Sequence, residues 1–353
     1  MRLKTNARVL CGLLAAVALT ACSSGTSGPA SSSGNASSSA KLKIALIVPE
    51  IADPYWVAAE DGAKAAAAKD NVALTITGTN TFTPSQYNAA LQDEITAGVN
   101  GLLVAPGDPV ASNGLIKTAR KQGIAVATVI VDAQGSDRQF FIGPNALQWG
   151  QGQAQRVIAY LKANHASGPV QAAIMSCSPT ALSQTLERTG FTDYVNSHNP
   201  YSSQFQVKVV AFLNSTADPT TNLAAYQNLA TAYPKLKVVV GQCGLDAISA
   251  GQVAQHMNTH WIVAGDSWLP QTLSYIQAGY VTWSVNEAPY ETLEKAVDLM
   301  SKALRKQAPM PSGIQAFTQT VAVKDPAQMQ TINFPAAQLV NVVTAKKSPD
   351  ATG

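Results

Sequence analysis

The chain contains 353 residues, of which 46% are hydrophobic and 13% are charged. This length accommodates two compact domains, and the apolar fraction excludes a disordered chain. The formal net charge of +3 matches the three basic residues Arg2, Lys4 and Arg8, so the remainder carries 21 basic and 21 acidic residues. A neutral body lacks the surplus of Lys and Arg that nucleic acid or an anionic membrane surface would require, which argues against both partners.

The first 40 residues have the pattern of an export signal followed by a tether. A basic stretch precedes an apolar run at 9–19, which is too short for a membrane-spanning helix of roughly 20 residues. The tetrapeptide LTAC at 19–22 resembles the bacterial lipobox, in which the cysteine becomes the acylated first residue. The alternative is an ordinary cleavage site that happens to precede a cysteine. We predict a lipoprotein signal peptide at 1–21, a lipid on Cys22 and a flexible Ser/Gly/Ala-rich tether at 22–40.

This signal sets the expected location. No later segment carries 18 consecutive apolar residues, so the lipid would be the membrane anchor. The protein is expected to be extracytoplasmic and anchored to the cell membrane, on the periplasmic side if an outer membrane exists.

The body of the chain begins with alternating strands and helices. A continuous apolar run such as 43–48 is typical of a parallel strand that is buried on both faces. Apolar residues at Tyr87, Leu91 and Ile95 have the spacing of one helix face. The pattern predicts strands at 43–48, 72–77, 99–104, 124–131 and 140–142, and helices at 54–69, 84–97, 109–122 and 146–163.

The same alternation then restarts. It predicts strands at 170–175, 205–212, 237–240, 261–264 and 281–285, and helices at 181–196, 220–233, 245–257 and 270–278. Two rounds of alternation predict an α/β protein with two doubly wound lobes, each built on a parallel sheet. Open sheets of this kind bind ligands beyond the carboxyl ends of their strands, so residues directly after each strand are the candidates for binding.

Catalytic and metal-binding motifs are missing from the sequence. There is no G-x-S-x-G elbow, no Walker loop and no complete G-x-G-x-x-G. His256 and His260 are four residues apart, but the Glu of a zinc-hydrolase helix is absent between them. The sequence therefore predicts no catalytic residue, no metal site and no cofactor, and it favours a binding protein over an enzyme.

Short motifs occur in a characteristic order: IALIV at 44–48, DPYW at 53–56, GVNGLLVAP at 98–106, IGPN at 142–145, VAGD at 263–266 and GYV at 279–281. Together they resemble the ribose-binding protein family, the sugar-binding proteins of bacterial ABC importers. The resemblance covers about residues 42–320. It implies the type I periplasmic-binding fold, in which two doubly wound parallel-sheet lobes are joined by a three-crossover hinge.

The resemblance also implies how the chain divides. Lobe I is expected at 41–144 and 289–318, because the helix near 289–306 returns to it. Lobe II is expected at 145–288 and 319–345, and a disordered tail at 346–353. The family implies that the lobes close on a ligand and that permease subunits of an importer then recognise the closed form. The protein is expected to act as a monomer.

The family's ligand contacts in the first lobe fall on Asp53, Tyr55 and Trp56. The alternatives are that Asp53 only caps the following helix and that the two rings only pack in the core. After the fourth strand the family has an Asp followed by a polar residue. Those positions read Ile130 and Val131 here, so we expect either a longer strand or a contact shifted to Asp132.

In the second lobe the family has an arginine at a position that falls on Glu187, and a slip of one residue would place Arg188 there. The alternative for both is a solvated helix face. The other positions that the resemblance implies are Gln242 beside the position of a family asparagine, Asp266, Trp268 and Glu287.

These departures from the family replace an arginine and amides with acids. Carboxylates accept hydrogen bonds from hydroxyl groups, so we expect a monosaccharide or polyol. Several acids in one cleft would repel one another unless Arg138, Arg188 or a positively charged ligand offsets them. An amino-bearing or cationic solute is therefore the alternative ligand, and a sensor subunit that presents its ligand to a membrane receptor is the alternative role.

Cys177 and Cys243 remain after the signal is removed and Cys22 takes its lipid. Both follow strands that should be neighbours in the second lobe, and they should lie at the same edge of its sheet. Adjacent strands are ~4.8 Å apart, within reach of a disulfide. An oxidising location favours that bond, so we predict it, and the alternative is two buried free thiols.

Overall fold

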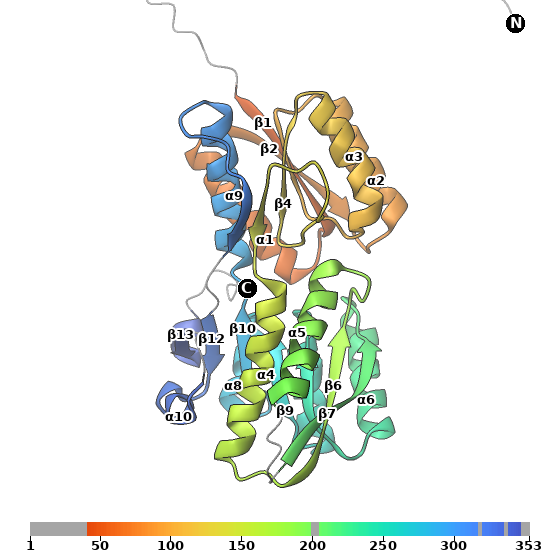
Figure 1. Ribbon diagram of the computed structural model, residues 1–353, viewed down its shortest axis with the longest axis vertical. Coiled ribbons are helices and arrows are strands. Elements are labelled where there is room, and N and C mark those ends of the chain that lie inside the picture. The colour runs from red at the N-terminus through yellow and green to blue at the C-terminus, as the bar shows by residue number, and fades with distance from the viewer. Residues whose placement is uncertain (1–40, 199–204, 317–319, 335–337, 347–353) are drawn as a thin grey trace, which may run out of the picture. The chain divides into compact units, whose positions relative to one another are not determined.

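The computed structural model describes residues 41–198, 205–316, 320–334 and 338–346. The predicted signal peptide, Cys22 and the predicted tether all lie outside the described residues, as do residues 347–353 of the predicted tail. The described chain forms two α/β lobes, each built on its own sheet (Figure 1). We call the lobe with the six-stranded sheet lobe I and the lobe with the seven-stranded sheet lobe II. The predicted fold class is therefore confirmed.

The sheet of lobe I is parallel throughout. Its strands, in spatial order, are β11 (Gly313–Ala316), β5 (Phe140–Gly143), β4 (Ala125–Val129), β3 (Gly101–Val104), β1 (Leu42–Glu50) and β2 (Val72–Thr79). The run Ile44–Val48 of β1 is fully buried, because helices cover both faces of the sheet. Its unbroken apolar pattern is the sequence signature of that arrangement.

Four helices cover this sheet. On one face lie α1 (Pro54–Lys69) and α9 (Pro289–Leu304), and on the other lie α2 (Pro84–Thr96) and α3 (Pro109–Lys121). Helices α1 and α3 start alike, with an aspartate that caps the first turn and a proline directly after it. These starts fix where the chain leaves the sheet edge and turns into a helix.

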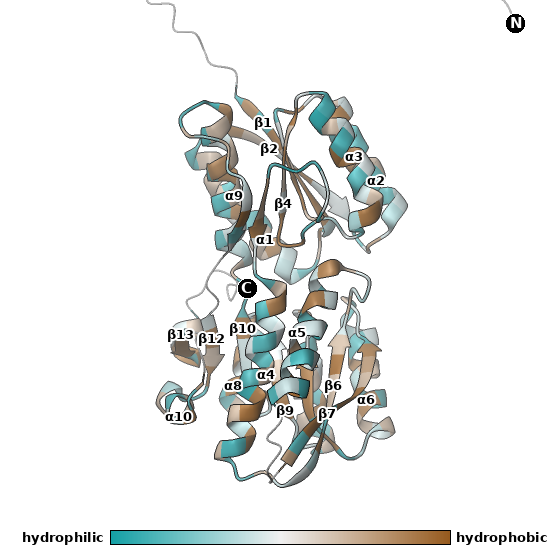
Figure 2. Cartoon of the chain, viewed as in Figure 1, coloured by the Kyte–Doolittle hydropathy of each residue, from teal (hydrophilic) through white to brown (hydrophobic). Residues whose placement is uncertain are grey.

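The sheet of lobe II is parallel except where β12 meets β10. Its strands, in spatial order, are β13 (Gln338–Asn341), β12 (Thr320–Val323), β10 (Trp283–Asn286), β9 (Ile262–Asp266), β8 (Leu236–Gly241), β6 (Gly168–Ser176) and β7 (Phe205–Asn214). Figure 2 shows apolar residues concentrated on the strands and polar residues on the outer faces of the helices. Each sheet is thus the centre of its own core.

Helices again cover both faces of this second sheet. One face carries α4 (Ala146–Ala163) and α5 (Leu182–His198). The other carries α6 (Pro219–Ala232), α7 (Asp246–Met257) and α8 (Pro270–Ala278). The short helices α10 (Pro326–Thr331) and α11 (Val342–Ala345) accompany the last strands. These late elements are four to six residues long, which is too short to give a readable hydrophobic period.

The end of the fourth strand differs from the prediction in a way that affects the site. The pattern predicted that the fourth strand would reach residue 131, but β4 ends at Val129. Ile130 has a φ of +63°, a left-handed conformation that is costly for a β-branched residue. Its N–H donates to the carbonyl of Ile142 on β5 at 2.9 Å, which holds the turn in place. The chain therefore leaves the sheet two residues earlier than expected.

A buried tyrosine fixes the edge of the sheet next to the site. The hydroxyl of Tyr87 donates to the carbonyl of Ala105 at 2.8 Å, and only 1% of the residue is exposed. We expect Tyr87→Phe to lower the free energy of unfolding by about 1 kcal/mol, because it leaves a buried carbonyl with one partner fewer. Urea unfolding measures this, with Tyr280→Phe at a partly exposed ring as the control. Equal stability of the two variants would contradict the prediction.

Candidate functional site

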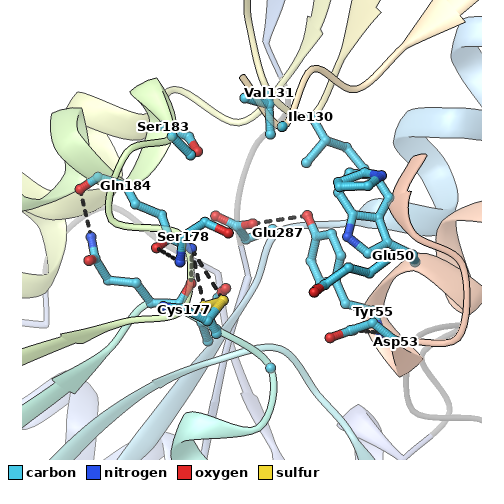
Figure 3. Close-up of a pocket in the computed structure, with 18 of the residues that line it drawn as sticks. Glu50, Asp53, Tyr55, Ile130, Val131, Cys177, Ser178, Ser183, Gln184 and Glu287 are labelled. Atoms are coloured by element: carbon cyan, nitrogen blue, oxygen red, sulfur yellow. Dashed lines mark hydrogen bonds between the residues drawn. A yellow bond between two sulfur atoms is a disulfide. The ribbon is translucent and has the colours of Figure 1, made fainter. Parts of the chain in front are cut away.

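One pocket collects side chains from both lobes at the carboxyl ends of the strands, where open parallel sheets bind ligands (Figure 3). Its cavity has a volume of about 100 Å³. Lobe I lines it with Pro49, Glu50, Asp53, Tyr55, Trp56, Phe82, Pro106, Gly107, Ile130, Val131 and Pro144. The remaining lining residues are Cys177, Ser178, Ala181, Ser183, Gln184, Glu187, Gln242, Cys243, Gly244, Asp266 and Glu287.

Seven of the ten residues predicted to bind ligand lie on this pocket, and three do not. Those brought together are Asp53, Tyr55, Trp56, Glu187, Gln242, Asp266 and Glu287. Those placed elsewhere are Asp132, Arg188 and Trp268.

The aromatic wall depends on the start of α1. Asp53 caps the helix by accepting a hydrogen bond from the backbone N–H of Tyr55 at 2.8 Å, and it also lines the pocket. Asp53 can therefore cap α1 and line the pocket at the same time. The rings of Tyr55 and Trp56 meet edge to face, with centroids 5.5 Å apart and planes at 80°. Burial raises the pKa of Asp53 to about 6, against the lowering effect of the hydrogen bond from Tyr55.

Asp132 does not line the pocket, contrary to the sequence prediction. Its carboxylate is held by Arg138, whose Nη2 donates to Oδ2 at 2.7 Å, and by the hydroxyl of Thr128 at 2.7 Å. The early turn at Ile130 explains this placement. That turn leaves Ile130 and Val131 on the pocket, so apolar side chains stand where the family has an acid and a polar residue.

The orientation of α5, which carries Glu187 and Arg188, determines which of the two side chains faces the pocket. Glu187 faces the pocket and is 4% exposed, whereas the guanidinium of Arg188 lies over the ring of Phe212, 5.4 Å from its centroid. The close packing of α4 against α5 sets this rotation. A Cβ added at Gly150 on α4 would lie 1.9 Å from the carbonyl oxygen of Glu187, so glycine is required there. Glu187, and not Arg188, therefore lines the pocket.

Trp268 is the third residue that the structure places elsewhere. Its ring packs in the core between the sheet of lobe II and α7 and α8, where 5% of the residue is exposed. Its indole N–H donates to the carbonyl of Ser284 at 3.0 Å, which satisfies the group in the core. Proximity in sequence to Asp266 therefore did not bring Trp268 to the cavity.

Three buried carboxylates dominate the electrostatics of the pocket. Glu187, Asp266 and Glu287 are each at most 8% exposed. Burial is the largest cause that raises all three pKa values, and repulsion from Glu287 raises those of Glu187 and Asp266 further. The pKa of Glu287 rises to about 7, although the hydroxyl of Tyr55 donates to its Oε2 at 2.9 Å. The pocket therefore favours a bound proton or a ligand that donates hydrogen bonds.

The amide of Gln242 connects this cluster to the pocket wall. Its Nε2 donates to Glu187 Oε2 at 3.0 Å and to the carbonyl of Gln184 at 2.9 Å. Both amide hydrogens are thus used within the protein. The buried Gln242 Oε1 and Asp266 Oδ1 have no hydrogen-bond partner among the described residues.

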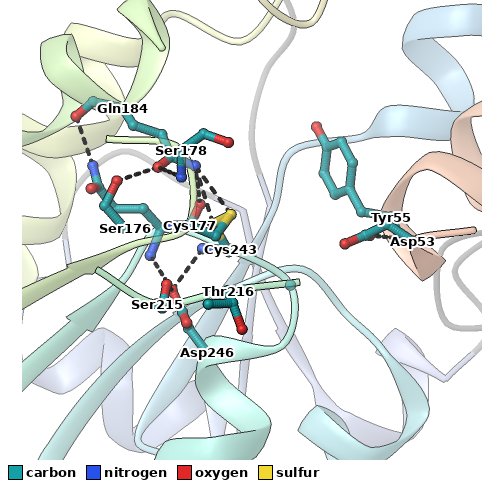
Figure 4. Close-up of a disulfide and its surroundings, with 12 residues drawn as sticks. Asp53, Tyr55, Ser176, Cys177, Ser178, Gln184, Ser215, Thr216, Cys243 and Asp246 are labelled. Carbon is teal, nitrogen blue, oxygen red and sulfur yellow. Dashed lines mark hydrogen bonds between the residues drawn. A yellow bond between two sulfur atoms is a disulfide. The ribbon is translucent and has the colours of Figure 1, made fainter. Parts of the chain in front are cut away.

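The predicted disulfide is present. It joins Cys177 after β6 to Cys243 after β8, with Cα atoms 6.1 Å apart (Figure 4). The two strands are neighbours, and Met175 pairs with Gly241, so each cysteine lies two residues beyond one rung of the ladder. Both cysteines line the pocket. The crosslink thus fixes the separation of two loops that carry pocket residues.

Several residues of the site were missed from the sequence. Glu50, Ser178 and Gln184 line the pocket, and buried Asp246 supports it by accepting from the backbone N–H groups of Gln242 and Cys243, each at 3.1 Å. Burial raises the pKa of Asp246 to about 7. Gln184 precedes Glu187 by three residues, so it shares a helix face with it, and that spacing was a usable signal. Asp246 gave no such signal, because its role is to hold a loop.

The described ranges contain no helix that is long and apolar enough to span a membrane. The same ranges contain no group of His, Cys, Asp and Glu side chains arranged to hold a metal ion.

Two characterised binding proteins are similar to this chain in sequence. The ribose import binding protein RbsB of Salmonella typhimurium is 26% identical over 304 residues, which are 85% of this chain and 94% of that protein. The D-ribose/D-allose-binding protein of Pseudomonas aeruginosa is 27% identical over 259 residues, which are 69% of this chain and 73% of that protein.

A solved structure shares the fold. An ABC transporter solute-binding protein from Burkholderia graminis, in complex with D-arabinose, is 23% identical, with a TM-score of 0.73 over 81% of this chain and 96% of that one. The family model described as "Periplasmic binding protein domain" matches residues 44–308. With this match over most of its length, the chain belongs to the periplasmic binding protein domain family.

Proposed function

We propose that this protein is the extracytoplasmic solute-binding protein of an ABC importer and captures a monosaccharide or polyol between its two lobes. The observation that carries the proposal is the pocket itself. Carboxylates that accept hydrogen bonds and the rings of Tyr55 and Trp56 line one cavity. Carboxylates suit hydroxyl groups, and aromatic rings suit the apolar C–H faces of a sugar.

The mechanism follows from the division of contacts between the lobes. Asp53, Tyr55 and Trp56 belong to lobe I, whereas Glu187 and Asp266 belong to lobe II. A ligand that touches both sets binds best when the lobes are closed, so it shifts the population towards closure. Permease subunits of the importer would then recognise the closed form.

The proposal includes the placement of the protein. A lipid on Cys22 would anchor it to the membrane, and residues 22–40 would let a monomer reach the permease. The lobe division predicted from the sequence, 41–144 with 289–318 and 145–288 with 319–345, is part of the same proposal. It is supported by the pairing of β11 with β5 in lobe I and of β12 with β10 in lobe II.

A thermal-shift screen tests the proposed ligand class. The purified full-length protein is heated with D-ribose, D-allose, D-arabinose, D-galactose or myo-inositol. We expect at least one to raise Tm by several degrees, because a ligand at 100 times its Kd stabilises the folded form by about 2.7 kcal/mol. Asp266→Asn should reduce that shift, and a protein whose Tm no sugar or polyol moves would contradict the proposal.

A further inference from the structure

Among the residues that the structure describes, the acids of the pocket have no positively charged partner. None of the lining residues is Lys, Arg or His. Of the two arginines that could have offset the acids, Arg138 is bound to Asp132, and Arg188 lies over Phe212. A buried charge is stable only when it is paired or hydrogen-bonded. The described residues supply no such charge, so a bound proton or a ligand would have to provide it.

The carboxylates of lobe II and the amide of Gln242 present acceptors to the pocket. Gln242 has used both amide hydrogens, which leaves its Oε1 as an acceptor. Asp266 Oδ1 is likewise unpartnered among the described atoms, and both residues are 4% exposed. The hydroxyl of Tyr55 donates its hydrogen to Glu287 Oε2. The carboxylates and the amide of Gln242 thus offer a ligand acceptors rather than donors, whereas the hydroxyls of Ser178 and Ser183 on the same lining can still donate to a sugar.

This inventory fits an ammonium group better than a hydroxyl. An ammonium group has three donors and no acceptor, whereas a hydroxyl has one donor and two lone pairs. A positive nitrogen would gain charge-assisted hydrogen bonds from the carboxylates.

We infer that Glu187, Asp266 and Glu287, together with Gln242 Oε1, form a subsite for a protonated amino group, so that the preferred ligand is an amino sugar or amino polyol. This inference rests on the proposed function as a sugar-binding protein. It assigns the aromatic wall to the carbon skeleton and the acids of lobe II to the nitrogen. The neutral parent sugar would bind through the same wall, but less tightly.

Calorimetric titration of the full-length protein near neutral pH tests this subsite. The probes are D-glucose, D-galactose and sorbitol, each with analogues in which one hydroxyl at successive carbons is replaced by an amine, and with N-acetylated forms that remove the charge. We expect at least one amine to bind about tenfold more tightly than its parent, since a charge-assisted hydrogen bond is about twice as strong as a neutral one. N-acetylation should abolish this gain.

Matched variants on α5 identify the groups responsible. Glu187→Gln should reduce the preference for the amine about tenfold, while Asp193→Asn, at an exposed position on the same helix, should leave it unchanged. Circular dichroism and Tm verify that both variants fold. An amine preference that survives in Glu187→Gln, and equally in Asp266→Asn and Glu287→Gln, would overturn the assignment to this cluster.

The remaining outcomes separate the two proposals. If a neutral sugar binds as tightly as every one of its amines, the amino-group subsite is overturned and the sugar-binding function stands. If no sugar, polyol or amino derivative binds, both are overturned.

Discussion

The ligand-free protein is expected to become less stable as the pH rises from 5 to 8. An acid whose pKa is higher in the folded than in the unfolded state binds more protons when folded, so the free energy of unfolding falls as the pH rises between the two pKa values. For Glu287 that window runs from the ordinary 4.5 to about 7. One pKa unit corresponds to about 1.4 kcal/mol, so this residue alone would remove roughly 3 kcal/mol across the window. Glu187 and Asp266, whose pKa values are also raised by burial, act in the same direction.

Urea unfolding at pH 5, 6, 7 and 8 measures this dependence. Glu287→Gln should flatten the curve, because glutamine keeps the shape of the side chain and does not titrate. Asp193→Asn, at an exposed position, should follow the wild type. A stability that rises or stays level between pH 5 and 8 would show that the cluster is neutralised in some other way.

Removal of the disulfide is the second large effect that we expect. Cys177 and Cys243 are 66 residues apart in sequence. In the chain-entropy model, a crosslink that closes a loop of this size destabilises the unfolded state by about 4 kcal/mol. The double variant Cys177→Ser/Cys243→Ser should therefore lose about that much free energy of unfolding. It should also weaken ligand binding, because the loops that the bond joins carry Ser178 and Gln242.

Reduction of the wild-type protein provides the matched comparison. The reduced protein and the double variant should unfold at the same urea concentration, below that of the oxidised protein. Intact mass should rise by two hydrogens on reduction. A mass that does not change, or a double variant as stable as the oxidised protein, would dismiss the crosslink as a stabilising element.

The fold was accessible from the sequence because its signals are local and repeated. The buried run Ile44–Val48 and the Asp-Pro start of α1 each determine an element on their own, and the predicted bounds of α1, α4 and α8 match the structure. The disulfide was accessible for a related reason. Once the order of the parallel strands is known, residues that follow neighbouring strands must lie at one edge.

The three residues that were predicted on the pocket but lie elsewhere share a physical cause. Asp132, Arg188 and Trp268 each stand within two residues of a position that does line the pocket. A single local feature decided each case: the left-handed turn at Ile130, the rotation of α5 set by Gly150, and the core hydrogen bond of Trp268. Such features depend on contacts distant in sequence, which a single chain read in order does not reveal.

Strand order has a final consequence for biogenesis. The edge strand β11 pairs with β5 although some 170 residues separate them. Between β10 and β12, which pair in lobe II, the chain forms α9 and β11 of lobe I. The lobe I sheet is therefore incomplete until β11 (Gly313–Ala316) has been synthesised, and the lobe II sheet is incomplete until β13 (Gln338–Asn341) has been synthesised. A protein severed within α4 would yield one fragment whose lobe I sheet lacks β11 and a second fragment that holds all seven strands of lobe II, so the two would have to assemble with each other to complete lobe I.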